Sequence, residues 1–113
     1  MRGVNRVVIS GNVTGAIQEG RTNSGVPTCT FVLASDRYTK DSIVTAWVKI
    51  NVYGKPLVDV CEPRLRKGRY VLVEGELMNR DGRTAELTEV RAKEVIFPTH
   101  EAEQESEGAG NGS

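Results

Sequence analysis

Hydrophobic and polar residues alternate along most of this chain of 113 residues, and a period of two predicts β-strands. Five segments rich in β-branched residues show the pattern: 4–13, 26–34, 43–53, 69–78 and 84–97. The third segment has the cleanest alternation. Between the strands, we expect a loop over 14–25, and polar hairpin connections over 37–42 and 79–83.

Three of these strands carry signs of a β-bulge. Gly11 and Gly75 each lie inside a strand, where glycine marks a bulge or a sharp bend. In the last strand the apolar phase shifts between Ala92 and Val95, which implies an extra residue.

One short helix is predicted between the third and fourth strands. Pro56 suits the first position of a helix, and Leu57, Val60 and Cys61 follow at helical spacing. Pro63 ends the helix within about two turns. The order is therefore three strands, one helix and two strands.

This order predicts an all-β, five-stranded barrel of the OB-fold type. Bulged strands in a small domain favour closure, because a closed barrel has no exposed edges. Residues 1–98 contain no linker and are expected to form one domain. Residues 99–113 are acidic and rich in glycine, and are expected to be a disordered tail.

The third strand carries the candidate functional face. Side chains alternate across a strand, so its two faces are distinct. The face predicted to line the barrel interior holds Val44, Ala46, Val48, Ile50 and Val52. The opposite face holds Thr45, Trp47, Lys49, Asn51 and Tyr53.

Aromatic and basic residues on one face are typical of a surface that binds single-stranded nucleic acid. Bases stack on aromatic rings while cations contact phosphates. Trp47 and Tyr53 lie about 20 Å apart along an extended strand, so each would contact a different base. Alternatively, both rings cover a subunit interface, although Lys49 and Asn51 would then need partners.

Basic residues supply the second requirement of such a surface. They gather in the predicted loops and at strand ends, where Tyr38 also lies. A solvated, charged loop is the alternative explanation for each one alone. The basic residues in these positions are Arg2, Arg6, Arg21, Arg37, Lys40, Lys55, Arg64, Arg66, Lys67, Arg69, Arg80 and Arg83.

The net charge of the whole chain conceals an uneven distribution of acidic and basic residues. The chain has 15 Lys and Arg against 15 Asp and Glu, a formal charge of zero, which argues against a nucleic-acid binder. Four of the acidic residues are glutamates of 101–113, a segment without Lys or Arg. The remaining 15 basic and 11 acidic residues give the body a charge of +4.

Other classes of protein find little support. The single histidine, His100, lies at the edge of the tail, and no nucleophile set, metal-ligand spacing or phosphate-binding loop is present, so we expect neither an enzyme nor a cofactor. Cys29 and Cys61 are expected to be free thiols. No apolar run approaches the length of a membrane span or a secretion signal, which favours a cytoplasmic protein.

Eight short segments, in order over residues 2–97, resemble the bacterial single-stranded DNA-binding protein family. They are RGVNRV (2–7), GNVT (11–14), FVLA (31–34), TAWVK (45–49), YGK (53–55), RKG (66–68), VEGEL (73–77) and EVRA (89–92). The resemblance implies an OB-fold, usually tetrameric, that coats single-stranded DNA during replication, recombination and repair. Because stacking and phosphate contacts read no base identity, we expect little sequence preference.

The resemblance also implies functional residues. Its stacking aromatics fall on Trp47 and Tyr53, with Tyr38 as a third candidate. Its DNA-contacting cations fall on Arg2, Arg6, Lys49, Lys55, Lys67 and Arg80. Arg21 and Arg37, which lie in the basic loops, complete the predicted nucleic-acid-binding set.

Three departures from the family pattern affect these expectations. The aromatic residue that often follows the Arg80 position is absent. Val48 stands where family members often have a histidine that contributes to subunit contacts. The tail lacks the Pro-Phe tip that binds replication or repair partners in the family. A phage-encoded member would fit. The alternative is an OB-fold module that binds proteins, or a primosome-accessory OB-fold protein. Proteins of the latter kind have a similar Ser-Gly-Val-Pro sequence at the start of the second strand, here residues 24–27.

Overall fold

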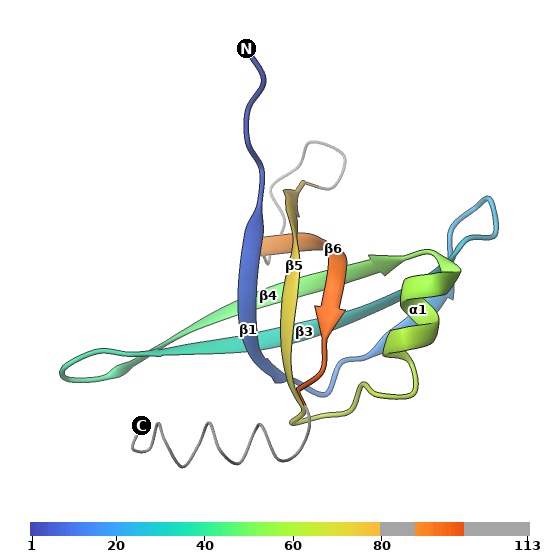
Figure 1. The fold of residues 1–113 in the computed structure, drawn as a ribbon. Coiled ribbons are helices and arrows are strands. Elements are labelled where there is room, and N and C mark those ends of the chain that lie inside the picture. The colour runs from blue at the N-terminus through green and yellow to red at the C-terminus, as the bar shows by residue number, and fades with distance from the viewer. Residues whose placement is uncertain (80–87, 99–113) are drawn as a thin grey trace.

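The computed structural model describes residues 1–79 and 88–98. These residues form six strands and one helix (Figure 1). In chain order they are β1 (Val7–Val13), β2 (Gln18–Arg21), β3 (Pro27–Tyr38), β4 (Ile43–Tyr53), α1 (Lys55–Cys61), β5 (Tyr70–Met78) and β6 (Thr88–Ile96).

Five strands close into a barrel, which confirms the predicted fold class. The order around the barrel is β1-β5-β6-β4-β3, and the pairs Asn12–Ala34 and Val13–Leu33 close β1 onto β3. All of these pairings are antiparallel except that of β4 with β6. The short strand β2 is an addition within the segment predicted to be a loop, and it pairs with the first residues of β3.

The first strand begins later than predicted. Residues 4–6 lie outside β1, and the side chain of Asn5 takes over the pairing there. Its Oδ1 accepts a hydrogen bond from the Leu77 amide at 2.8 Å, and its Nδ2 donates to the Leu77 carbonyl at 2.9 Å. A side chain thus satisfies backbone groups that a strand would otherwise pair.

β3 and β4 form a long hairpin that runs past the barrel (Figure 1). β3 continues to Tyr38, so the predicted connection over 37–42 begins two residues too early. Beyond the barrel the interior row of β4 has no core to face. Val44 is 45% exposed and Ala46 is also exposed, so their predicted interior position is wrong.

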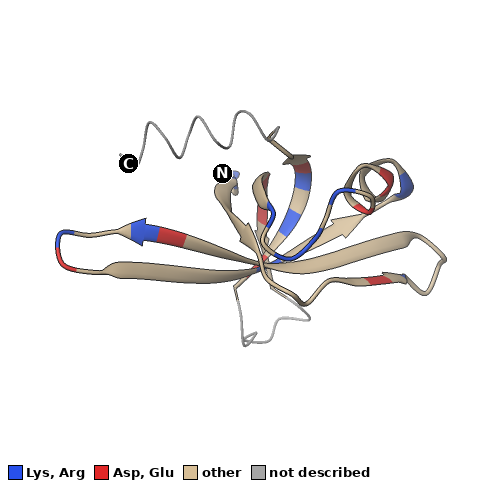
Figure 2. Cartoon of the chain, turned by 90° about the horizontal axis from the view of Figure 1, so that it is seen from below, with Lys and Arg blue, Asp and Glu red and all other residues tan. Residues whose placement is uncertain are grey.

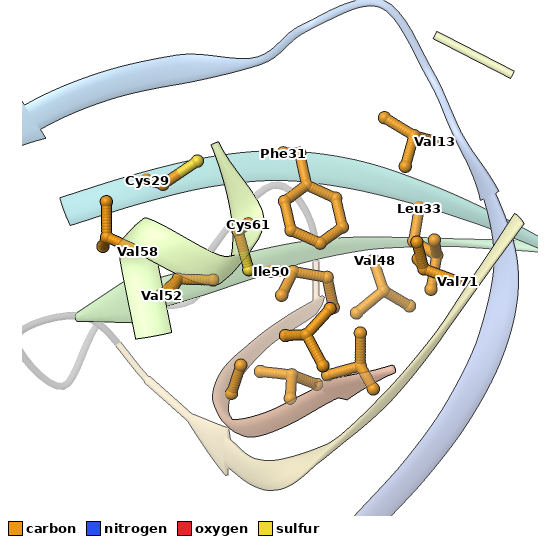
Figure 3. Close-up of a cluster of buried hydrophobic side chains, with 14 residues drawn as sticks. Val13, Cys29, Phe31, Leu33, Val48, Ile50, Val52, Val58, Cys61 and Val71 are labelled. Atoms are coloured by element: carbon orange, nitrogen blue, oxygen red, sulfur yellow. The ribbon is translucent and has the colours of Figure 1, made fainter. Parts of the chain in front are cut away.

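The core fills the barrel from several strands and the helix (Figure 3). Val48, Ile50 and Val52 line the interior, as predicted. From the helix, Cys61 is buried as its spacing suggested, together with Val58, whereas Val60 is exposed. Leu77 shares the alternation phase of the buried Val71 and Val73 of β5, but it is exposed near the end of that strand.

Two glycines lie where strands approach closely. A Cβ atom at Gly11 would overlap the carbonyl oxygen of Ala34, and one at Gly75 would overlap that of Arg91. The β5–β6 register shifts at Gly75, leaving Lys93 unpaired as an extra residue in β6. This bulge explains the phase change predicted in the last strand, because it lets Ala92 and Val95 both face the core.

Cys29 and Cys61 are free and buried, in agreement with the expected thiols. Both lie at the helix side of the core (Figure 3). Burial, the main cause, raises the pKa of Cys29 to about 11 and that of Cys61 to about 12. Both thiols therefore stay protonated in the folded protein at neutral pH.

No helix among the described residues is long and apolar enough to span a membrane. The same residues contain no group of three or more histidine, cysteine, aspartate or glutamate side chains that could hold a metal ion.

Candidate nucleic-acid interface

The side of the β3–β4 hairpin that faces away from the core is the candidate interface. Directly paired residues of neighbouring strands lie on the same side of a sheet. The register pairs Trp47 with Ala34, Lys49 with Val32 and Tyr53 with Thr28. We call this surface, which includes Thr28, Val32, Ala34, Trp47, Lys49 and Tyr53, the outer hairpin face.

The three aromatic residues of the predicted site differ in accessibility. Tyr38, at the end of β3, is 76% exposed and Trp47 is 53% exposed. Tyr53 is less accessible, because its side chain is half-buried and the guanidinium carbon of Arg91 lies 4.9 Å from its ring centroid. Trp47 and Tyr38 thus offer open ring surface, whereas Tyr53 is already in contact with a cation.

Asn51 does not belong to the accessible surface, although the alternation of β4 placed it there. It is 1% exposed. Its Nδ2 donates to Glu89 Oε1 at 3.0 Å and approaches the Met78 sulfur at 3.5 Å. The expected polar group between the two rings is therefore Lys49 alone, which is half-buried.

Three predicted cations are exposed and take part in no ion pair within the described residues. Arg2 precedes β1, Arg37 lies near the end of β3, and Lys67 follows the helix. Arg80 lies outside the described residues. Lys and Arg residues are spread over several elements of the described chain (Figure 2).

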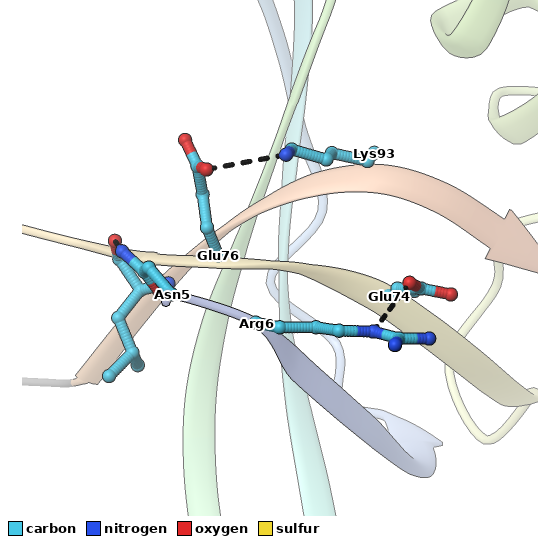
Figure 4. Close-up of polar contacts among 6 residues, drawn as sticks. Asn5, Arg6, Glu74, Glu76 and Lys93 are labelled. Atoms are coloured by element: carbon cyan, nitrogen blue, oxygen red, sulfur yellow. Dashed lines mark hydrogen bonds and ion pairs between the residues drawn. The ribbon is translucent and has the colours of Figure 1, made fainter. Parts of the chain in front are cut away.

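Three other predicted cations have partners. Arg6 Nε lies 2.9 Å from Glu74 Oε2 (Figure 4), and Lys55 Nζ lies 2.7 Å from Asp59 Oδ2. The hydrogen bond to Asp59 raises the pKa of Lys55. Arg21 donates to the Gly25 carbonyl at 3.0 Å. All three side chains are exposed, so phosphates can compete for them at little cost.

The family model that matches this chain covers residues 4–99, most of its length, and describes the single-strand binding protein family. The chain belongs to this family. The resemblance found in the sequence is thereby confirmed, and the family's members include relatives from several bacteria.

Two relatives come from Chlorobaculum tepidum. The chain is 37% identical over 84 residues to single-stranded DNA-binding protein 1, covering 70% of this chain and 51% of the relative. It is 33% identical over 111 residues to single-stranded DNA-binding protein 2, covering 83% and 70%. The chain thus spans about half of the first relative's length.

A solved structure supports both the fold and the family. It is an SSB from Plasmodium falciparum in complex with single-stranded DNA, with a TM-score of 0.75 and 28% sequence identity. The similarity covers 88% of this chain and 98% of the solved chain.

Arg91 is not among the binding residues predicted from the sequence. Arg91 lies in β6, 38 residues beyond Tyr53, and β6 joins β4 by a parallel pairing. No alternation within a strand reveals which distant strand will pair with it. Its charge and its place in EVRA (89–92), one of the segments that resemble the family, were the available signals.

Proposed function

We propose that this protein binds single-stranded DNA without sequence preference. The observation that carries the proposal is Trp47, a large aromatic ring that is 53% exposed on the outer hairpin face, with Lys49 two residues along the same strand. Family membership and the DNA-bound structural neighbour support it.

Stacking supplies the first part of the mechanism. Each base in a single strand has an accessible face, and stacking on an aromatic ring is worth roughly 1–3 kcal/mol per base. Trp47 and Tyr38 offer open ring surface to bases, and Tyr53 contributes a partly covered ring. A duplex keeps its bases paired and stacked, so it gains none of these contacts.

Phosphate contacts supply the second part. Arg2, Arg37 and Lys67 need break no ion pair among the described residues before they meet a phosphate. Lys49, Arg6, Lys55, Arg21 and Arg80 complete the proposed set. Because neither stacking nor phosphate contact reads base identity, we expect little sequence preference.

Coating single-stranded DNA in this way protects it during replication, recombination and repair. The proposed activity is binding rather than catalysis, in a cytoplasmic setting. Residues 1–98 form the proposed binding domain, and 99–113 form an acidic tail. Arg69 Nη2 donates to the Pro98 carbonyl at 3.3 Å, which ties the chain to the domain at that boundary.

We also propose a homo-oligomer, with a tetramer as the expected state. The outward sides of β1, β5 and β6 carry exposed apolar side chains: Val8 on β1, Tyr70 on β5 and Ile96 on β6. Half-buried Leu72 pairs with Ile96 in the register and adds to this surface. Polar residues share this face, such as Glu74 opposite Val8. Exposed apolar side chains gathered on one sheet face are nevertheless typical of subunit contacts.

Titration of the intrinsic Trp47 fluorescence tests the proposed function. We expect oligo-dT to quench the fluorescence strongly, and an increase in salt to weaken the binding. A matched duplex should change the signal little. Unchanged fluorescence with no complex at low salt would reject the proposal and leave Trp47 as a protein-contact residue.

A further inference from the structure

We propose that Arg91 contacts DNA directly and that it forms a single binding unit with Tyr53. This inference rests on the proposed function and adds a residue to it. The unit consists of the Tyr53 ring and the guanidinium that lies over it, with a distance of 4.9 Å from the guanidinium carbon to the ring centroid.

The parallel pairing of β4 with β6 creates the unit. The register places Arg91 opposite Asn51, two residues before Tyr53 on β4. Asn51 is buried and donates to Glu89, whereas the Arg91 side chain is exposed and lies over the Tyr53 ring. Arg91 therefore extends the outer hairpin face onto a third strand.

The nearby carboxylates do not neutralise Arg91. Its register partner on β5 is Glu76, but Glu76 Oε2 lies 3.4 Å from Lys93 Nζ (Figure 4). Glu89 accepts the hydrogen bond from Asn51. Within the described residues Arg91 is in no ion pair, so its charge is available to an anionic ligand.

The ring also prepares the guanidinium for binding. A guanidinium over an aromatic ring is attracted to the ring and loses freedom before the ligand arrives. Less entropy is then lost when DNA binds. The five N–H donors of arginine suit a phosphate, and the guanidinium face that is turned away from the ring can stack on a base.

This arrangement changes the expected role of Tyr53. A half-buried ring that carries a guanidinium has little surface left for a base. Its main contribution is to position Arg91, and binding at this end of the face should depend on charge more than binding at Trp47 does.

Lys93 provides a matched control on the same strand. It is also an exposed cation of β6, but the bulge separates it from the pairing of β6 with β4 and it already has Glu76 as a partner. Both variants are made in a Glu76→Gln background, because the loss of Lys93 alone would free Glu76 beside Arg91. In that background Arg91→Gln and Lys93→Gln remove the same single charge, so the pair separates a specific contact from a change in net charge.

The experiment measures anisotropy of labelled oligo-dT with wild type, with the E76Q parent, and with R91Q and K93Q in that background, over a range of salt concentrations. For R91Q we expect affinity about tenfold lower at low salt, the effect of losing one charge-assisted contact. The slope of log K against log salt should become shallower by about 0.7, the value for one phosphate contact with a single strand. K93Q should leave the slope unchanged.

A double-mutant cycle with Tyr53→Leu tests the coupling. If the ring acts through Arg91, the affinity losses of Y53L and R91Q will be less than additive. Arg91→Met keeps the unbranched stem and serves as the second variant if R91Q lowers the unfolding midpoint more than K93Q does. A wild-type slope and affinity in the charge-removing variant would overturn the role of Arg91. Additive affinity losses in the double-mutant cycle would overturn the coupling of Arg91 to Tyr53. Failure of the wild-type protein to bind would instead overturn the proposed function.

Discussion

Trp47 and Asn51 project from the same side of β4, but only Trp47 is accessible to a ligand. Trp47 lies where β3 and β4 leave the barrel, beside the small side chain of Ala34. Asn51 lies where β6 joins β4, and Glu89 and Met78 contact it. The available ring surface thus depends on the neighbouring strand as well as on the residue.

Replacing Trp47 tests the stacking contact at this scale. We expect Trp47→Ala to weaken binding of labelled oligo-dT by roughly 1–3 kcal/mol, because one stacked base loses its ring. Val60→Ala, which trims an exposed apolar residue of α1, should bind as wild type does. Equal affinities of W47A and wild type would assign the ring to another role.

The two buried thiols should make stability fall at alkaline pH. Their pKa values are about 11 and 12 in the folded protein against 9.0 in the reference state, so above pH 9 the unfolded chain loses protons that the folded chain keeps. Stability is full below pH 9 and declines as pH rises towards 11–12.

Urea unfolding at increasing pH measures this effect. By about pH 10 each thiol should reduce the free energy of unfolding by about 1 kcal/mol. A variant with both Cys29→Ala and Cys61→Ala provides the control, since its overall stability is lower but its decline above pH 9 should be smaller. An identical decline in both proteins would contradict the thiol assignment.

At the scale of elements, a closed barrel requires close approaches that a side chain would block. β1 meets β3 at Gly11, and β5 meets β6 at Gly75 beside the bulge. The sequence indicated both glycines as irregular positions. It did not indicate which strand lies against each, because that depends on closure of the sheet.

Gly75→Ala should destabilise the fold. The added methyl group overlaps the Arg91 carbonyl oxygen, which is backbone and moves only if β6 shifts. Overpacking of this kind costs typically 1–3 kcal/mol, which urea unfolding detects. Gly3→Ala is the control, since nothing lies within 4 Å of that position. Equal stability of G75A and G3A would show that the strands separate easily there.

At the scale of the whole molecule, the barrel has two outward surfaces of different character. The outer hairpin face combines aromatic rings with cations, while the sheet of β1, β5 and β6 exposes Val8, Tyr70 and Ile96. The first suits a nucleic acid and the second suits another copy of the chain. A zero net charge describes neither surface.

Ile96→Lys tests the proposed oligomer. A lysine in a packed apolar contact would bury an unpaired charge, so sedimentation velocity should show a smaller assembly than wild type. Val60→Lys introduces the same charge at an exposed position on α1 and should leave the mass unchanged. A wild-type mass for I96K would remove this surface from the interface.

The sequence by itself determined the order of the five barrel strands and the helix, part of the core and the family, but not the short strand β2. These follow from local patterns: alternation defines strands, prolines bound the helix, and the phase shift in β6 marks its bulge. The resemblance also selected the candidate binding residues, although their roles remain predictions.

Only the tertiary structure decided which residues of these patterns are covered. Val44 and Ala46 follow the interior phase but lie beyond the barrel, where no opposite wall exists. Asn51 follows the outer phase but lies against β6, and the same parallel pairing brings Arg91 onto Tyr53. Alternation fixes the side of a strand on which a residue lies, whereas its surroundings depend on segments distant in the sequence.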